Sequence, residues 1–191
     1  MGPKGLSSRL EGSVFRTMGS VNLKKGAHVV YGGYGVCLVE DIRSLDLGHC
    51  GHLDQYFVLR QEDNCNSTLY VPVENDRLCG RLRRVLTKGE IRQLLLESQE
   101  HPLCWNPDRQ ARAAQFQQIL QRGVQEELVG MIRCIYRERE ALRARGKKLP
   151  DADLRALKRA QRLVEGEFSF ALGIPQEQVD AYIRSVLGVG E

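Results

Sequence analysis

The alternation of apolar and polar positions changes character near residue 87 of this 191-residue chain. Before that point, short runs rich in β-branched and aromatic residues are separated by clusters of Gly, Asn and Asp, which is typical of strands joined by turns. The runs are HVVY, VCLVEDI, QYFVLR and STLYVPV. They recur about every ten residues with no helical pattern between them, which favours a small antiparallel barrel or meander over βαβ units.

The borders of this first region follow from local composition. The pair Gly32-Gly33 lies between the first two runs and suits a turn with positive φ. The segment LCGRLRRVL is expected to return as a last short strand. Residues 1–24 mix Gly, Ser, Lys and Arg without periodicity, which predicts a disordered leader, and Met18 is an alternative start to Met1.

After residue 87 the apolar period becomes helical. Thr87 and Glu90 fit a capping box, with Thr87 as N-cap and Glu90 reaching back from the third helical position. Pro102 and Pro107 bracket an interruption, and Gly123, RGKKLPDAD and LGIPQEQ mark further breaks. Between these breaks the apolar residues fall at helical spacing. They are Phe116, Ile119, Leu120; Leu128, Met131, Ile132, Ile135, Tyr136; Leu154, Leu157, Val164, Phe168, Ala171; and Val179, Tyr182, Ile183, Val186, Leu187.

These patterns predict an α+β protein in which a small antiparallel β-barrel precedes an all-α domain of four to five helices. The expected organisation is a disordered leader at 1–24, a barrel at 25–86, a short helix and linker at 87–104, and a helical domain at 105–188.

Composition and charge narrow the class of protein only modestly. Apolar residues make up 42% of the chain and charged residues 27%, which is ordinary for a soluble globular protein, and the net charge is +4. No apolar run approaches the ~18 residues of a membrane span, and the first residues lack the apolar core of a secretory signal. We therefore expect a cytoplasmic protein that does not contact a membrane. The six cysteines are scattered without a CxxC pair, which favours free thiols over a disulfide framework.

Candidate catalytic and metal-binding residues are sparse. His49, Cys50 and His52 form the triplet HCGH, and Cys65 lies in the next loop, but zinc sites normally take four ligands in paired spacings. We interpret the triplet as a solvated turn. The chain contains no GxSxG, GxxxxGK[ST], HExxH or GxGxxG motif, so we expect neither an enzyme nor a metal ion or other cofactor.

The segment 133–162 carries the strongest charge signal, with eleven Lys or Arg residues against four acidic ones. Two interpretations stay open: these residues are the ordinary solvated faces of two helices, or they form a basic surface that neutralises phosphates. Trp105, the single tryptophan, lies in the polar segment EHPLCWNPDRQAR and is equally ambiguous. It is either a plug between the two domains or an exposed apolar wedge of the kind that enters base steps of nucleic acid.

The barrel region resembles the N-terminal domain of the CarD/CdnL family of bacterial transcription regulators. The resemblance rests on GAHVVYGGYGVCLVEDI, YFVLR and LYVPVEN. The matching positions are Gly26, Val29, Val30, Tyr31, Gly35, Val39, Glu40, Ile42, Tyr56, Val58, Leu59, Val71, Pro72, Glu74 and Asn75. The second half also matches in order, with a tryptophan shortly after the barrel and helices ending in LKRAQRLVEGEFSFALG, so the resemblance covers about residues 25–187.

The resemblance implies a Tudor-like barrel that binds the β subunit of RNA polymerase, similar to a module of the transcription-repair coupling factor. It also implies a helical domain that contacts promoter DNA at the upstream edge of the melted bubble and stabilises the open complex. The family tryptophan that wedges into the minor groove aligns with Trp105. The expected polymerase-binding residues are Arg43, Tyr70, Val71 and Pro72, and the expected DNA-binding residues are Trp105, Arg109, Arg112, Lys148, Arg155 and Lys158.

This chain departs from the family pattern at several positions. Tyr70 stands where some members carry an arginine, which predicts an aromatic polymerase contact, and Asp108 follows the tryptophan where others are basic. The predicted protein is a monomeric, nucleoid-associated transcription regulator. The alternatives are a barrel-plus-helix adaptor that binds protein without touching DNA and, last, an enzyme or redox protein that uses the Cys and His residues.

Overall fold

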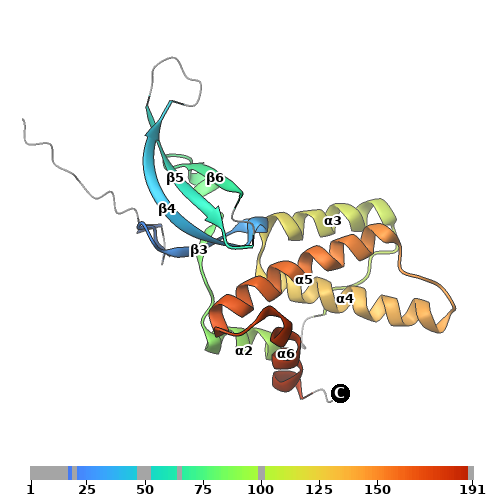
Figure 1. The fold of residues 1–191 in the computed structure, drawn as a ribbon. Coiled ribbons are helices and arrows are strands. Elements are labelled where there is room, and N and C mark those ends of the chain that lie inside the picture. The colour runs from blue at the N-terminus through green and yellow to red at the C-terminus, as the bar shows by residue number, and fades with distance from the viewer. Residues whose placement is uncertain (1–16, 19–20, 47–52, 64–65, 99–101, 189–191) are drawn as a thin grey trace, which may run out of the picture.

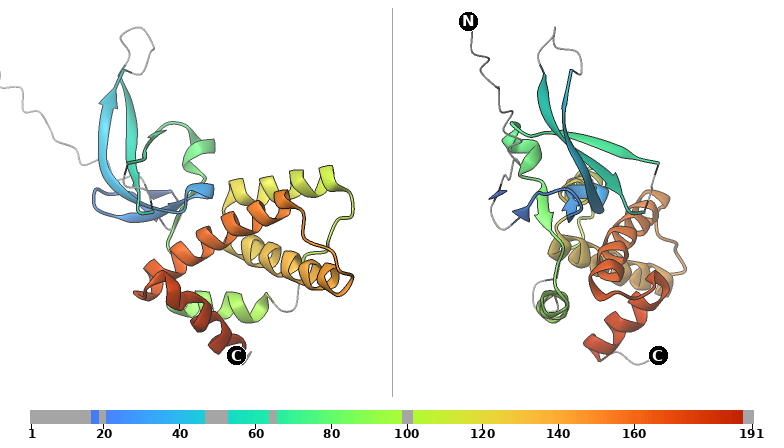
Figure 2. Two further views of the ribbon diagram at one scale, coloured as in Figure 1. Left: turned by 45° about the vertical axis from the view of Figure 1, so that its right-hand side comes forward. Right: turned by 60° about the vertical axis from the view of Figure 1, so that its left-hand side comes forward.

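The computed structural model describes residues 17–18, 21–46, 53–63, 66–98 and 102–188. Within these residues the chain forms a β-rich part followed by a helical part, which lie beside one another in Figures 1 and 2. The α+β class expected from the sequence is confirmed. The HCGH triplet and Cys65 lie outside the described residues.

Five strands form one antiparallel sheet in the order β6-β5-β4-β3-β7. They are β3 (His28–Tyr31), β4 (Val36–Leu45), β5 (Asp54–Gln61), β6 (Thr68–Pro72) and β7 (Leu82–Arg84), and a short helix α1 (Asp76–Cys79) precedes β7. The sheet bends at a register shift between Val39 and Asp41 of β4. Because β6 and β7 are the outer strands and do not pair with each other, the barrel is open at β6.

The leader prediction extends too far toward the barrel. Two short strands, β1 (Thr17–Met18) and β2 (Val21–Asn22), pair with each other, and Leu23 is only 1% exposed. Leu23 packs in the same apolar cluster as Phe57 and Val71, so it belongs to the barrel core. Residues 1–16 and 19–20 of the expected leader lie outside the described residues.

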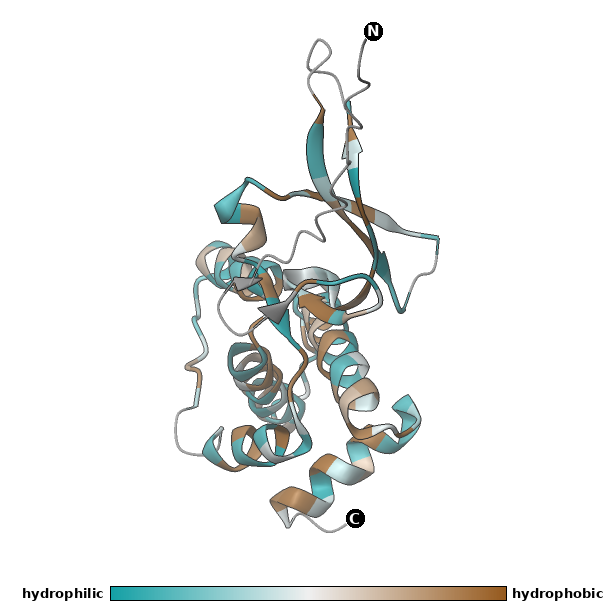
Figure 3. Cartoon of the chain, turned by 90° about the vertical axis from the view of Figure 1, so that its left-hand side faces the viewer, coloured by the Kyte–Doolittle hydropathy of each residue, from teal (hydrophilic) through white to brown (hydrophobic). Residues whose placement is uncertain are grey.

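The helical half contains α2 (Lys88–Glu97), α3 (Arg109–Arg122), α4 (Gln125–Ala144), α5 (Asp151–Leu172), the 3-10 turn η2 (Gln176–Gln178) and α6 (Val179–Leu187). The capping box predicted at Thr87 and Glu90 is confirmed at the start of α2. Each helix has hydrophobic and hydrophilic residues around its axis (Figure 3), as expected for helices that bury one face. None of the described helices combines the length and apolar character needed to cross a membrane.

The barrel meets the helices at a tight backbone contact. The 3-10 turn η1 (Gly32–Tyr34) lies against the last turn of α3, where a Cβ on Gly33 would sit 2.2 Å from the Leu120 carbonyl oxygen. Gly123, with φ +65°, faces Gly32 just as closely from the other side, so only glycine fits at this contact. The two halves therefore touch through the main chain as well as through side chains.

A buried ion pair reinforces this contact. Glu167 of α5 is 1% exposed, and both its carboxylate oxygens accept hydrogen bonds of 2.6 Å from Arg83 of β7. Gln125 and the Leu86 N–H donate to the same carboxylate at 2.6 and 3.0 Å. Since a buried charge is tolerated only when paired and hydrogen-bonded, this network links the last barrel strand to α5 in one arrangement.

Candidate binding surfaces

The strand β6 uses one side of its main chain to pair with β5. At one end of the strand the Val73 N–H donates to Gln55 C=O at 2.8 Å, and at the other end the Gln61 N–H donates to Ser67 C=O at 3.3 Å. In an antiparallel ladder, paired and outward-facing residues alternate. Odd-numbered residues of β6 therefore bond to β5, and even-numbered ones point their N–H and C=O groups away from the sheet.

Thr68 and Tyr70 are the residues left at this free edge. No described strand pairs with it, and the carbonyl of Pro72, the next outward-facing group, accepts from the Asn75 N–H at 3.2 Å. The edge thus presents two donors and two acceptors from Thr68 and Tyr70. Unpaired groups of this kind are a template for another strand.

The sheet register places three of the four residues expected to bind polymerase on one face. Arg43 pairs across the sheet with Tyr56, which in turn pairs with Pro72, and Tyr70 lies two positions from Pro72. Tyr70 is 49% exposed. Val71 points to the opposite face and is 1% exposed, so its side chain belongs to the barrel core, and a partner could reach only its main chain.

Arg43 is held by a neighbouring carboxylate on the same strand. Its Nε donates to Asp41 Oδ2 at 2.9 Å, and this hydrogen bond is the main reason that the pKa of Asp41 lies below its usual range. Both side chains remain accessible to water, so the pair orients Arg43 without removing it from the surface.

Trp105 lies partly buried on the helical domain. Its indole makes an edge-on contact with Phe116, with ring centroids 6.2 Å apart, and the Arg112 guanidinium stacks 4.2 Å from the indole centroid. The wedge that the sequence suggested is therefore not fully exposed, because its aromatic surface is shared with the helical core. The packing fixes the orientation of the indole.

Arg112 has a structural role in place of the expected DNA contact. It is 4% exposed, and its Nε and Nη2 donate to the two carboxylate oxygens of Asp153 at 3.1 and 2.9 Å. Its Nη1 donates to the Asn106 carbonyl at 2.8 Å. The guanidinium thereby ties the Trp105 segment to the first turn of α5, and its charge is already compensated.

The other expected DNA-binding residues are accessible. Arg109 opens α3, Lys148 lies in the loop before α5, and Arg155 and Lys158 lie on the outer face of α5. Within the described ranges none of the four forms an ion pair. Because Arg112 holds the Trp105 segment to the start of α5, Arg109 and Arg155 belong to the same end of the helical domain as Trp105.

Two further cations of α5, Arg159 and Arg162, belong to the basic segment 133–162 but were not among the six residues expected to bind DNA. Both are exposed, and with Arg155 and Lys158 they fall at i, i+3, i+4 and i+7, the spacing that places residues on one helical face. That spacing was the available signal. It was overlooked because the whole segment 133–162 is basic, so no single face stood out.

Four of the six cysteines lie within the described residues. Cys37, Cys104 and Cys134 are free thiols, as expected for them, and Cys79 donates to the Pro72 carbonyl at 3.2 Å. Burial, helped by Glu62, raises the pKa of Cys37 to about 12, so this thiol is protonated at neutral pH and a poor nucleophile. No group of three His, Cys, Asp or Glu suited to a metal ion occurs in the part of the chain that the structure describes.

The structure combines an open antiparallel barrel that has a free strand edge with a helical domain rich in basic residues. Residues 23–86 match the family model of the CarD-like/TRCF RID domain, so the chain has a CarD-like domain, and the resemblance seen in the sequence is confirmed for the barrel. A domain of this kind is characteristic of transcription factors that interact with RNA polymerase. A search of curated proteins found no match to the chain.

Proposed function

We propose that the protein is a non-enzymatic transcription factor that binds the β subunit of RNA polymerase through β6 and stabilises the open promoter complex through its helical domain. The observation that carries the proposal is the free edge at Thr68 and Tyr70 within a CarD-like domain. An exposed edge accepts an extended segment of a partner by main-chain hydrogen bonds, while nearby side chains supply specificity. Tyr70, Arg43 and Pro72 flank the edge for that purpose.

The helical domain would then contact promoter DNA at the upstream edge of the bubble. Trp105 presents the accessible part of its indole to a distorted base step, and Arg109, Lys148, Arg155 and Lys158 neutralise nearby phosphates. Such contacts are weak and independent of sequence, but tethering to polymerase raises their effective concentration. The Arg83–Glu167 pair supports this, since it fixes the direction of the helical domain relative to β6.

Stabilisation follows from a difference in affinity between two states. Only the open complex offers the bubble edge, so a protein that binds this edge shifts the population toward the open state by its differential binding free energy. Such a protein would act as a monomer in the cytoplasm, associated with the nucleoid, and would need no metal or cofactor.

The barrel half of the proposal is tested with a proline on the free edge. Thr68→Pro removes the outward-facing N–H of Thr68 and no bond of the β5–β6 ladder, so the fold should persist. We expect Thr68→Pro to weaken binding to the isolated polymerase β subunit by roughly tenfold, the value of one hydrogen bond of about 1.4 kcal/mol. The control Thr68→Ala removes the side chain only and should bind like wild type. Equal affinities for Thr68→Pro and Thr68→Ala would exclude pairing at this edge.

A second candidate is a barrel-plus-helix adaptor that binds polymerase but no DNA. The partial burial of Trp105 favours it, since an indole packed on Phe116 has a structural role already. This candidate predicts that the protein binds the β subunit but leaves the lifetime of the open complex unchanged.

A further inference from the structure

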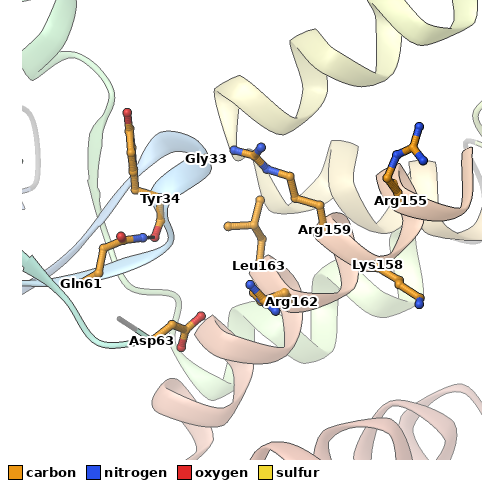
Figure 4. A pocket seen from close by; sticks show the side chains of 9 residues that line it. All are labelled: Gly33, Tyr34, Gln61, Asp63, Arg155, Lys158, Arg159, Arg162 and Leu163. Carbon is orange, nitrogen blue, oxygen red and sulfur yellow. Dashed lines mark hydrogen bonds between the residues drawn. The ribbon is translucent and has the colours of Figure 1, made fainter. Parts of the chain in front are cut away.

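A groove of about 470 Å³ lies between the tip of the barrel and α5 (Figure 4). Gly33, Tyr34, Gln61 and Asp63 line it from the barrel side. The opposite wall is α5, which lines the groove with Arg155, Lys158, Arg159, Arg162 and Leu163. In Figure 4 the Lys158 side chain points away from the barrel residues. We call this space the junction groove, because it follows the seam between the two halves.

The four cations of α5 give the junction groove a strong positive charge. They lie on one face of the helix, and the Arg159 side chain extends toward η1 (Figure 4). Among the described residues none of the four forms an ion pair, and Asp63 is the single acidic residue in the lining. With no internal partner, these charges are available to an anionic ligand.

Tyr34 provides a rigid aromatic surface at the same place. It is 42% exposed, and its ring stacks on Tyr31 with centroids 5.5 Å apart and an interplanar angle of 11°. Gln61 donates to the Tyr34 carbonyl at 2.6 Å, and the turn that carries Tyr34 is packed against α3 through Gly33. One face of the phenol ring is thus supported by Tyr31, and the ring borders the groove.

A second groove, of about 800 Å³, continues on the other side of Tyr34. Arg77, Arg81 and Arg122 line it together with Tyr34 and Arg159, which border both grooves. Arg81 donates to the Gln121 carbonyl and Arg122 to Glu127, so these two partly retain internal contacts. A basic path therefore runs past the exposed tyrosine on both sides.

We propose that this path binds single-stranded nucleic acid, with phosphates against the α5 cations and a base stacked on Tyr34. A positive groove that tracks the backbone beside an aromatic platform is the arrangement that binds single strands without reading sequence. Along α5, residues 155 to 162 span roughly 10 Å at 1.5 Å per residue, enough for a few nucleotides. A duplex would leave Tyr34 unused, because its bases are already stacked on each other. The inference rests on the proposed function, since an open promoter supplies a displaced strand.

The test uses the full chain without polymerase and a fluorescent oligothymidylate, with anisotropy as the readout. We expect Tyr34→Ala to weaken binding roughly tenfold, within the range of one lost base stack, and Tyr34→Phe to bind like wild type. Arg159→Ala should weaken binding and lower the slope of log affinity against log salt by about 0.7. The control Arg92→Ala removes an exposed cation of α2, outside the groove, and should change neither quantity.

Three results would overturn the inference. The first is oligothymidylate binding that Tyr34→Ala and Arg159→Ala leave unchanged. The second is tighter binding of a duplex of equal length, equally strong in Tyr34→Ala, which would make the path a duplex surface. The third is binding of a nucleoside triphosphate with none of oligothymidylate. Failure of the proposed function would look different, because Thr68→Pro and Trp105→Ala should disturb polymerase and promoter binding while leaving oligothymidylate binding intact.

Discussion

The free edge of β6 and the cationic face of α5 are the two surfaces that we propose bind partners, and they would select those partners by different physics. The β6 edge offers directional main-chain groups of two residues beside an exposed tyrosine. The α5 face offers four long cationic side chains that have no internal partners among the described residues. A strand edge requires one geometry from its partner, whereas a row of cations requires only negative charge nearby.

This difference suggests a division of roles. The edge, with specific hydrogen bonds and one aromatic contact, suits a single protein partner and should be little affected by salt. The α5 face suits phosphates in any sequence context and should weaken steeply as salt rises. The glycine contact and the Arg83–Glu167 pair hold the two surfaces in one orientation.

Breaking the Arg83–Glu167 pair should produce the largest effect on the stability of the protein. Arg83→Ala leaves the fully buried Glu167 carboxylate without its cation, which should lower the free energy of unfolding by about 3 kcal/mol. Arg84→Ala is the matched control, because its neighbouring ion pair with Glu90 is exposed and contributes far less. Urea denaturation measures both free energies of unfolding, and equal losses would contradict a special role for the Arg83–Glu167 pair.

Truncating Tyr70 beside the free edge of β6 should have a smaller effect, and it should act on the binding free energy for polymerase. Tyr70→Ala removes an exposed aromatic ring beside the free edge and should cost about 2 kcal/mol of binding to the β subunit, with unfolding unchanged. Arg155→Ala, on the other surface, should leave this affinity intact. Calorimetric titration checks both variants, and a loss on Arg155→Ala comparable to that on Tyr70→Ala would contradict the division of roles.

The helix that connects the two regions is sensitive to its cap. Thr87→Ala removes the N-cap of α2 and should lower the free energy of unfolding by about 1 kcal/mol.

Hydrogen bonds from Arg84 and Thr87 hold the pKa of Glu90 well below its usual range. A carboxyl with a lowered folded pKa contributes its stability above its unfolded value and loses it as the pH falls. The advantage of wild type over Glu90→Gln should therefore shrink below about pH 4. Thermal unfolding across this range would contradict the account if the difference grew with acid.

The smallest expected effect is a difference in alkylation between one thiol of the barrel and one thiol of the helical half. Cys37 in the barrel is fully buried, and burial raises its pKa to about 12, whereas Cys104 before α3 is exposed. Iodoacetamide at neutral pH should alkylate Cys104 in the native protein and leave Cys37 unmodified until unfolding. Mass spectrometry of the digested product would decide it, and early modification of Cys37 would restore the redox interpretation.

Local patterns predicted the elements well, because their causes are local. The capping box at Thr87, the strands and the helical stripes depend on neighbours within a few residues, and all of these appear in the structure. The alternation of side chains along β6 also predicts that the Val71 side chain is buried, because Tyr70 and Val71 must face opposite sides of the sheet. Arg112 lies four residues before Phe116 on the buried face of α3, so the helical spacing predicts its burial as well.

Contacts between distant segments could not be predicted in this way. Arg83 and Glu167 are 84 positions apart, and nothing in either neighbourhood identifies the other as its partner. The junction groove likewise exists only because η1 meets α5 in space. Pairing over such distances depends on the packing of the whole fold, which a periodic pattern does not contain.

The lifetime of an open promoter complex, measured after adding a competitor that traps free polymerase, tests the central claim most directly. We predict that wild-type protein prolongs the lifetime and that this effect fades as salt rises. Thr68→Pro should reduce the effect because it weakens binding to polymerase, and Trp105→Ala should reduce it while polymerase binding persists. An unchanged lifetime with wild-type protein bound to polymerase would contradict the account.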